Sequence, residues 1–177
     1  MKITATSKFN YKTIKNFVRT MAFYKTNPLK KLITYCAIFA VLSAVILLEM
    51  YLLDNDPVFV VALIVAILAV LFELYLYFIL PRIRYNALGQ MKGCTNEFTF
   101  TDDSIRQVSY DNGYSGESRI DYKVLSRAIE TSVYFYIFQT KSQAMVVEKA
   151  TIEGGTAEEL RMKQQSVLGK KYKIYNY

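Results

Sequence analysis

The chain has 177 residues, of which 53% are hydrophobic, 15% aromatic and 21% charged, and its formal net charge is +7. An ordinary soluble domain is roughly 45–50% apolar, so this composition indicates membrane segments beside one modest domain. The absence of histidine excludes a Ser–His triad and a histidine-ligated metal or haem, and two cysteines, Cys36 and Cys94, are too few for a disulfide scaffold or a cysteine-ligated zinc site.

Residues 1–31 form a basic arm with eight Lys or Arg side chains and no acidic one. Its weakly alternating start, Lys2–Thr6, is compatible with a short strand. A helix is predicted from the N-cap Asn10 to Lys25, with one apolar face made by Ile14, Phe17, Val18, Met21 and Tyr24. A basic amphipathic helix next to apolar runs is typical of the anionic inner leaflet, and its rival interpretation is a nucleic-acid patch. We predict that Phe17 and Met21 lie at the lipid boundary, that no nucleic acid binds, and that the membrane-surface residues are Lys12, Lys15, Arg19 and Lys25.

Two apolar runs follow, Leu32–Leu53 and Val58–Leu80, separated by the acidic turn Asp54–Pro57. A membrane-spanning helix needs about 20 mostly apolar residues, and each run is long enough. The alternative is a pair of buried helices in a soluble core, which the lack of a polar face disfavours. We therefore predict a transmembrane hairpin over residues 32–80 in the cell membrane. Because Lys and Arg accumulate on the cytoplasmic side, both termini are expected to be cytoplasmic and the turn outside.

Each apolar run contains one carboxylate, Glu49 in the first and Glu73 in the second. An ionisable residue inside a membrane is a functional hypothesis by default. At about 1.5 Å of rise per residue, their depths in a hairpin differ by roughly 15 Å, so the two cannot share a site. Each could snorkel to a nearby interface or pack between helices. The sharper alternatives are an oligomer contact through the hairpin and a counter-charge for a bound partner.

From about Thr95 the hydrophobic pattern takes the two-residue period of strands, after a glycine-containing linker. Asp111-Asn112-Gly113 is a strong hairpin signal between the second and third strands. The predicted strands are Glu97–Thr101, Ile105–Tyr110, Tyr114–Ile120, Leu125–Thr131, Tyr134–Thr140 and Ala144–Glu148.

A helix is predicted from the capping box at Thr156 and Glu159 to about Leu168, where Gly169 ends it. Several antiparallel strands and one closing helix indicate a small pleckstrin-homology-like sheet or barrel over residues 95–177. The predicted fold class is therefore a membrane α-helical hairpin of two transmembrane helices, followed by an α+β domain of this kind.

Two segments, Ile120–Thr131 and Tyr134–Phe138, carry a resemblance to a known family. Their pattern of Ile, Tyr, a Glu-Thr pair and an aromatic strand is similar to the central stretch of the YcxB-like family of bacterial membrane proteins. The order of basic arm, two apolar runs and compact domain also resembles that family. The chain differs in having Glu148-Lys149 where the family often has Pro-Lys. The resemblance implies an architecture and no established activity.

The remaining polar clusters fit ordinary structural roles. Asp102 and Asp103 are neighbours in a turn, where their carboxylates point apart, which disfavours a metal site. Cys94 has no clustered base beside it, and Gly113–Gly116 lies in a hairpin rather than in a phosphate loop. Gly154–Thr156 could hold an anion but matches a plain helix cap. We predict no catalytic residue, no cofactor and no metal ligand.

The expected function is binding without chemistry. A two-span bacterial membrane protein would present its cytoplasmic pleckstrin-homology-like domain to lipid head groups or to a protein partner at a sheet edge. The basic arm and the Lys170–Lys173 segment support the lipid. The alternative is an immunity protein that protects the membrane of the producing cell against a toxin or bacteriocin, which a neighbouring toxin gene would favour. An enzyme or transporter ranks third, because two spans cannot enclose a pathway without oligomerising.

Overall fold

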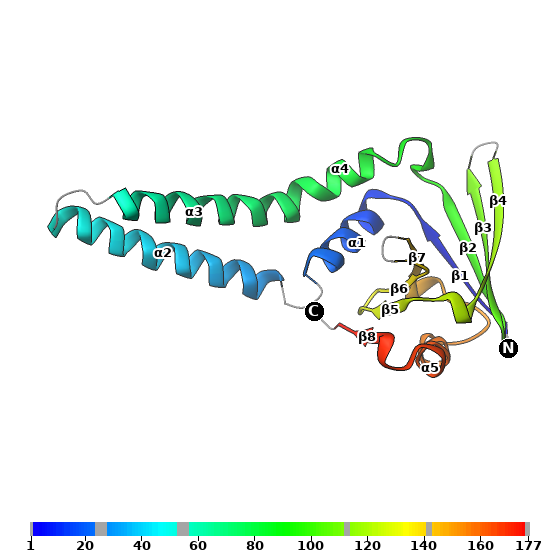
Figure 1. The fold of residues 1–177 in the computed structure, drawn as a ribbon. Coiled ribbons are helices and arrows are strands. Elements are labelled where there is room, and N and C mark those ends of the chain that lie inside the picture. Colours follow the sequence, from blue (N-terminus) through cyan, green and yellow to red (C-terminus); the bar gives the residue numbers. More distant parts are fainter. Residues whose placement is uncertain (1, 24–27, 53–56, 112–113, 141–142, 176–177) are drawn as a thin grey trace. The chain divides into compact units, whose positions relative to one another are not determined.

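The computed structural model describes residues 2–23, 28–52, 57–111, 114–140 and 143–175 (Figure 1). The chain divides into two compact units. One unit combines Met1–Phe17 with Tyr85–Tyr177, and the other is Val18–Arg84. Helix α1 (Tyr11–Phe23) begins in the first unit and ends in the second. The unit that holds the sheets is therefore assembled from both ends of the chain.

The Val18–Arg84 unit is helical. Helix α2 (Pro28–Leu52) lies beside α3 (Pro57–Leu74), and the two form a hairpin in Figure 1. A π-helical turn, η1 (Tyr75–Ile79), joins α3 to α4 (Leu80–Asn86). In the described part of the chain, one helix, Leu63–Asn86, is long and apolar enough to cross a membrane. The apolar part of α2 is the shorter segment Ile33–Leu47.

The prediction of two transmembrane helices is wrong for this reason. Within the described residues, the apolar segment of α2 is Ile33–Leu47, which at about 1.5 Å per residue covers roughly 22 Å of a hydrocarbon core about 30 Å thick. The predicted turn at Asp54–Pro57 lies almost entirely outside the described residues.

The first sheet is antiparallel and contains the strand from the N-terminus. Its order is β1-β2-β3-β4, and β1 pairs with β2 from Ile3↔Phe100 to Lys8↔Thr95. The strands are β1 (Ile3–Lys8), β2 (Thr95–Phe100), β3 (Ser104–Asp111) and β4 (Tyr114–Asp121). The predicted hairpin between β3 and β4 is confirmed by the pair Asp111↔Tyr114, although residues 112–113 themselves lie outside the described residues.

The second sheet has the order β7-β6-β5-β8, and its last strand runs parallel to β5. Its strands are β5 (Arg127–Glu130), β6 (Tyr134–Phe138), β7 (Ala144–Glu148) and β8 (Tyr172–Ile174). Short 3-10 turns η2 (Gly89–Met91), η3 (Tyr122–Val124), η4 (Lys149–Thr151) and η5 (Gly169–Lys171) connect the elements. Helix α5 (Ala157–Leu168) precedes η5 and β8.

One hydrophobic core joins both sheets and α5. Phe98 and Phe100 of the first sheet, Phe135 and Ile137 of β6, and Leu160 of α5 belong to one buried cluster. Along β6, residues alternate between this cluster and the opposite face of the sheet, as the period of a strand requires. The core therefore depends on segments from the whole unit, including Ile3 and Ala5 of β1.

The predicted pleckstrin-homology-like sheet or barrel closed by a C-terminal helix is also wrong. The unit is α+β with two four-stranded sheets. The chain does not end its fold at the helix, because β8 follows α5 and adds a parallel strand beside β5. In addition, β1 comes from before the helical unit, so residues 95–177 contain only part of the first sheet. The predicted capping box of α5 is confirmed, with Thr156 and Glu159 each bonding the other's backbone.

Candidate functional site

Three of the predicted membrane-surface residues lie on α1, and Lys25 lies outside the described residues. The predicted N-cap is confirmed, because the backbone N–H of Thr13 donates to Asn10 Oδ1 at 2.9 Å. Lys12 is exposed, and the Lys15 ammonium lies 5.9 Å from the centre of the Tyr11 ring. In the first turns of α1, the Lys12 side chain is therefore exposed to solvent, whereas the Lys15 side chain lies near the Tyr11 ring of the same helix.

The apolar face of α1 packs against β6. The ring of Phe17 packs against the rings of Tyr136 and Phe138 in β6, with centroids 5.5 and 6.3 Å apart. Ile14, on the same face, is buried. Because these contacts bury Ile14 and cover part of Phe17, less of this face is left to enter a membrane, whereas Met21 stays partly exposed.

Arg19 has a structural partner in the helical unit. Its guanidinium lies 3.5 Å from the centre of the Tyr77 ring, and its Nε and Nη2 atoms each donate to the Tyr77 carbonyl at 3.3 Å. In a regular helix this carbonyl would accept from the residue four positions later, which is Pro81 and has no N–H. Arg19 thus supplies donors where the π-helical turn and the proline interrupt the helix.

We expect Arg19→Gln to lower the stability of the full chain by about 1.5 kcal/mol, because a charged donor to a helix carbonyl is lost. The loss should be smaller in a Pro81→Ala background, where the backbone N–H at position 81 can serve the Tyr77 carbonyl. Thermal unfolding in detergent, followed by circular dichroism at 222 nm, measures both. Lys12→Gln on the exposed side of α1 is the control. An equal cost of Arg19→Gln in both backgrounds would contradict this role.

The two predicted intramembrane carboxylates lie on different helices. Glu49 belongs to α2, and its side chain lies outside the described residues. Glu73 belongs to α3 and is half-buried, two residues before the π-helical turn. Their roles stay predictions.

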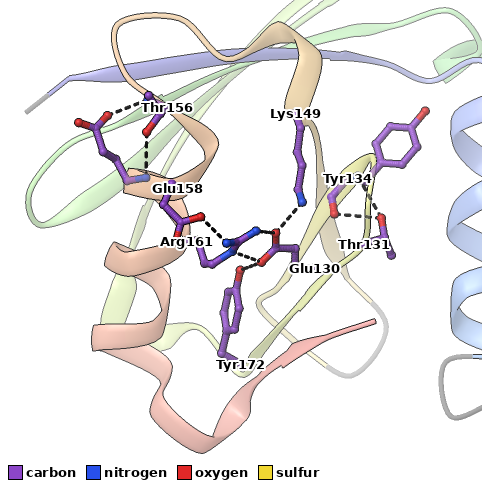
Figure 2. Close-up of polar contacts among 9 residues, drawn as sticks. Glu130, Thr131, Tyr134, Lys149, Thr156, Glu158, Arg161 and Tyr172 are labelled. Carbon is purple, nitrogen blue, oxygen red and sulfur yellow. Dashed lines mark hydrogen bonds and ion pairs between the residues drawn. The ribbon is translucent and has the colours of Figure 1, made fainter. Parts of the chain in front are cut away.

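A buried ionic cluster forms around Glu130, at the end of β5 (Figure 2). Its carboxylate is 1% exposed and accepts from Lys149 Nζ at 2.5 Å, Arg161 Nη2 at 2.5 Å, Arg161 Nε at 2.8 Å and Tyr172 Oη at 2.5 Å. Arg161 also pairs with Glu158 one turn earlier in α5. These donors come from η4, α5 and β8, so one carboxylate ties four elements together.

The electrostatics of this cluster favour the ionised carboxylate. Burial by itself would raise the pKa of Glu130, but the bonds from Arg161, Lys149 and Tyr172 outweigh it and lower the pKa to about 2. Burial, and then the bond to Glu130, raise the pKa of the Tyr172 phenol, so Tyr172 stays a donor. A carboxylate whose two oxygens each accept two hydrogen bonds in this way holds the fold together and is not directed at a substrate.

The sequence pattern did not predict this cluster, although Glu130 lies in the segment that carries the family resemblance. The available signal was a charged residue that ends the short apolar strand Arg127–Glu130. Its partners could not be found from the sequence, because Arg161 is 31 residues away and Tyr172 is 42 residues away.

A hollow lies beside β3, β4 and η2, with a volume of about 540 Å³. Cys94 lines it with Met91, Ser109, Gly116 and Glu117. Burial, followed by the nearby charge of Asp111, raises the pKa of the Cys94 thiol, which disfavours the nucleophilic thiolate form. Within the described residues, no group of three or more Cys, Asp or Glu side chains could hold a metal ion.

Comparisons with protein-family models, with curated proteins and with solved structures gave no match to this chain. The resemblance to the YcxB-like family therefore stays a prediction.

Proposed function

We propose that this chain is a non-enzymatic cell-membrane protein whose two-sheet unit binds anionic lipid head groups on the cytoplasmic side. The observation that carries the proposal is the apolar helix Leu63–Asn86, of which no part of the most apolar window is buried inside the protein. Leu68, Leu71 and Phe72 are each more than half exposed. A continuous apolar surface of this kind is unfavourable in water and favourable in lipid.

The pairing of β1 with β2 constrains how the helical unit would meet the membrane. Lys8, which precedes the Val18–Arg84 unit, and Thr95, which follows it, are register partners in one sheet, so the segments on both sides of that unit must lie on one side of a membrane. In the proposed arrangement, the exposed apolar helix Leu63–Asn86 enters the bilayer from the cytoplasmic side. Both parts of the sheet unit then remain together in the cytoplasm.

The lipid part of the proposal is supported by lysines on the two-sheet unit. Lys12 on α1, Lys170 and Lys171 in η5, and Lys173 in β8 are all exposed. A basic residue near an anionic leaflet contributes about 1 kcal/mol, and salt screens this attraction. No described ion pair occupies these four ammonium groups, whereas Lys149 is held by Glu130. The immunity function stays a prediction, because it depends on a toxin gene beside this one.

Membrane insertion is tested by replacing Leu68 and Leu71 together with Arg. Each Arg near the middle of a membrane helix costs about 2.5–3.5 kcal/mol, so the double variant should be extracted from membranes by alkaline carbonate while the unchanged chain stays in the pellet. The matched control replaces Met162 and Val167, two exposed apolar residues of α5, with Arg. Equal extraction of the unchanged chain and the Leu68/Leu71 variant would contradict insertion.

Lipid binding is tested by amine labelling of the full chain in vesicles, read by mass spectrometry. We expect Lys170, Lys171 and Lys173 to label several-fold more slowly in vesicles that contain phosphatidylglycerol than in pure phosphatidylcholine, and high salt should remove the difference. Lys123, exposed in η3, is the internal control. Equal labelling of the three lysines in both vesicles would contradict the proposed ligand, even if the membrane-insertion test succeeds.

A further inference from the structure

Among the described strands, β4 is the longest one that lies at the edge of a sheet. At the other end of its sheet, β1 exchanges backbone bonds between Thr4 and Glu153 and lies beside β7. Strand β8 is three residues long and carries the exposed Lys173. By contrast, β4 has eight residues, no proline, and an uninterrupted register with β3. Natural sheets block open edges by shortness, charged side chains (especially Lys), Pro or bulges, so a long edge without Lys or Pro, whose charges have both signs, can accept a strand of complementary charge.

The hairpin geometry shows which backbone groups of β4 point outward. Only two residues join Asp111 to Tyr114, so this pair is a hydrogen-bonded pair of the antiparallel ladder. Hydrogen-bonded pairs alternate along the ladder, so the backbone groups of Gly116, Ser118 and Ile120 also face β3. The N–H and C=O groups that face away from β3 belong to Ser115, Glu117, Arg119 and Asp121.

We propose that β4 pairs with β4 of a second copy of this chain, antiparallel and centred on Ser118. In this register Glu117 lies opposite Arg119 of the other copy, and Ser115 lies opposite Asp121. All four are outward-facing positions, so their backbone groups can complete the ladder. The two first sheets then continue as one eight-stranded sheet across a two-fold axis.

Charge selects this register over its neighbours. The nearest alternative registers that still place outward-facing residues opposite each other are centred on Glu117 or on Arg119. In the first, Glu117 lies opposite Glu117 of the other copy, and in the second, Arg119 lies opposite Arg119. Like charges directly opposite each other destabilise a strand pair. Both charged side chains are exposed and already extended: Glu117 pairs with Arg106 at 2.6 and 2.7 Å, and Arg119 Nε donates to Ser104 Oγ at 2.9 Å.

The register is tested by disulfide trapping of the full chain in detergent, in a Cys36→Ser background. Ser118 would meet its own copy at a non-hydrogen-bonded pair, where Cα atoms are about 4.5 Å apart and a disulfide fits. We expect Ser118→Cys to form a covalent dimer under mild oxidation. Ser115→Cys alone should not, whereas Ser115→Cys with Asp121→Cys should. Dimer formation by Glu117→Cys, or no more dimer from Ser118→Cys than from the exposed control Lys123→Cys, would overturn the proposal.

A charge exchange tests the same contact without cysteines. Glu117→Arg and Arg119→Glu should each weaken the dimer by roughly tenfold in dissociation constant, because each places like charges opposite one another twice. The double variant restores opposite charges and should restore the dimer. Sedimentation in detergent gives the dissociation constants, and circular dichroism verifies that each variant is folded. A monomeric unchanged chain, or a double variant as weak as the single ones, would overturn the proposal and leave a different protein as the occupant of this edge.

Discussion

Replacing Glu130 with Ala is expected to destabilise the two-sheet unit by about 3–5 kcal/mol, because it leaves Lys149 without its anion and Arg161 with only the exposed Glu158, at a site where the carboxylate was 1% exposed. The loss should appear as a lower midpoint of guanidinium unfolding, followed by circular dichroism at 218 nm. Hydrogen exchange should accelerate in β5, β8 and α5, which the carboxylate joins.

The exposed carboxylate Asp102, which pairs with Lys163, provides the control. Its side chain is 75% exposed, so Asp102→Ala should leave the unfolding midpoint almost unchanged. If Glu130→Ala were as mild as Asp102→Ala, the buried cluster would not hold the four elements together as its geometry indicates.

The same carboxylate is expected to give the unit an acid-sensitive component of stability. The pKa of Glu130 is lowered to about 2 in the folded chain, against an ordinary value of 4.5. Its contribution is therefore fully present above about pH 4.5 and is lost as the pH falls toward 2. Glu130→Gln should flatten this part of the stability profile, and an unchanged slope between those values would contradict the assignment.

A fragment that begins at Pro81 and ends at Tyr177 is expected not to fold stably, because it lacks β1. Ile3 and Ala5 are each 1% exposed in the core, and without them Phe98 and Phe100 lose part of their cover. Burying one such aliphatic side chain contributes about 2 kcal/mol, and the missing strand also leaves β2 with an open edge. Circular dichroism and hydrogen exchange of the fragment measure the loss.

Adding β1 back should rescue the fragment. The unit contains Met1–Phe17, so this segment can be joined through a Gly/Ser linker to Tyr85–Tyr177. The joined chain should be folded, and the same chain with Ile3→Asp should not be. A folded Pro81–Tyr177 fragment would show that β1 is dispensable.

Local sequence was enough to locate most elements. Strands β3, β4, β6 and β7 coincide closely with the predicted segments. The reason is that an alternation of apolar and polar residues between two turns can be recognised within a single strand. The cap of α5 was equally local, since Thr156 and Glu159 are three residues apart. The helix after Asn10 was predicted from its period and its cap, and it is α1.

The positions of the candidate site residues depend on contacts between residues that are distant in the sequence. The spacing of α1 defined an apolar face, but only the fold showed that Phe17 lies against β6 and that Arg19 serves the carbonyl of Tyr77. Charge alone had placed Arg19 in the membrane-surface group. The apolar runs in the sequence also predicted two helices long enough to span a membrane, whereas the described residues contain one.

By itself, the sequence determined the strand pattern, the caps, the basic start and the strongly apolar helical middle, because each of these is encoded in residues a few positions apart. Only the tertiary structure decided that β1 completes a sheet with β2, that β8 joins β5 in parallel, and that Glu130 gathers Lys149, Arg161 and Tyr172. Those pairings join segments that are far apart in the chain, and they depend on which surfaces pack together after the intervening loops have closed. The spacing of residues along the sequence does not show which distant segments pair.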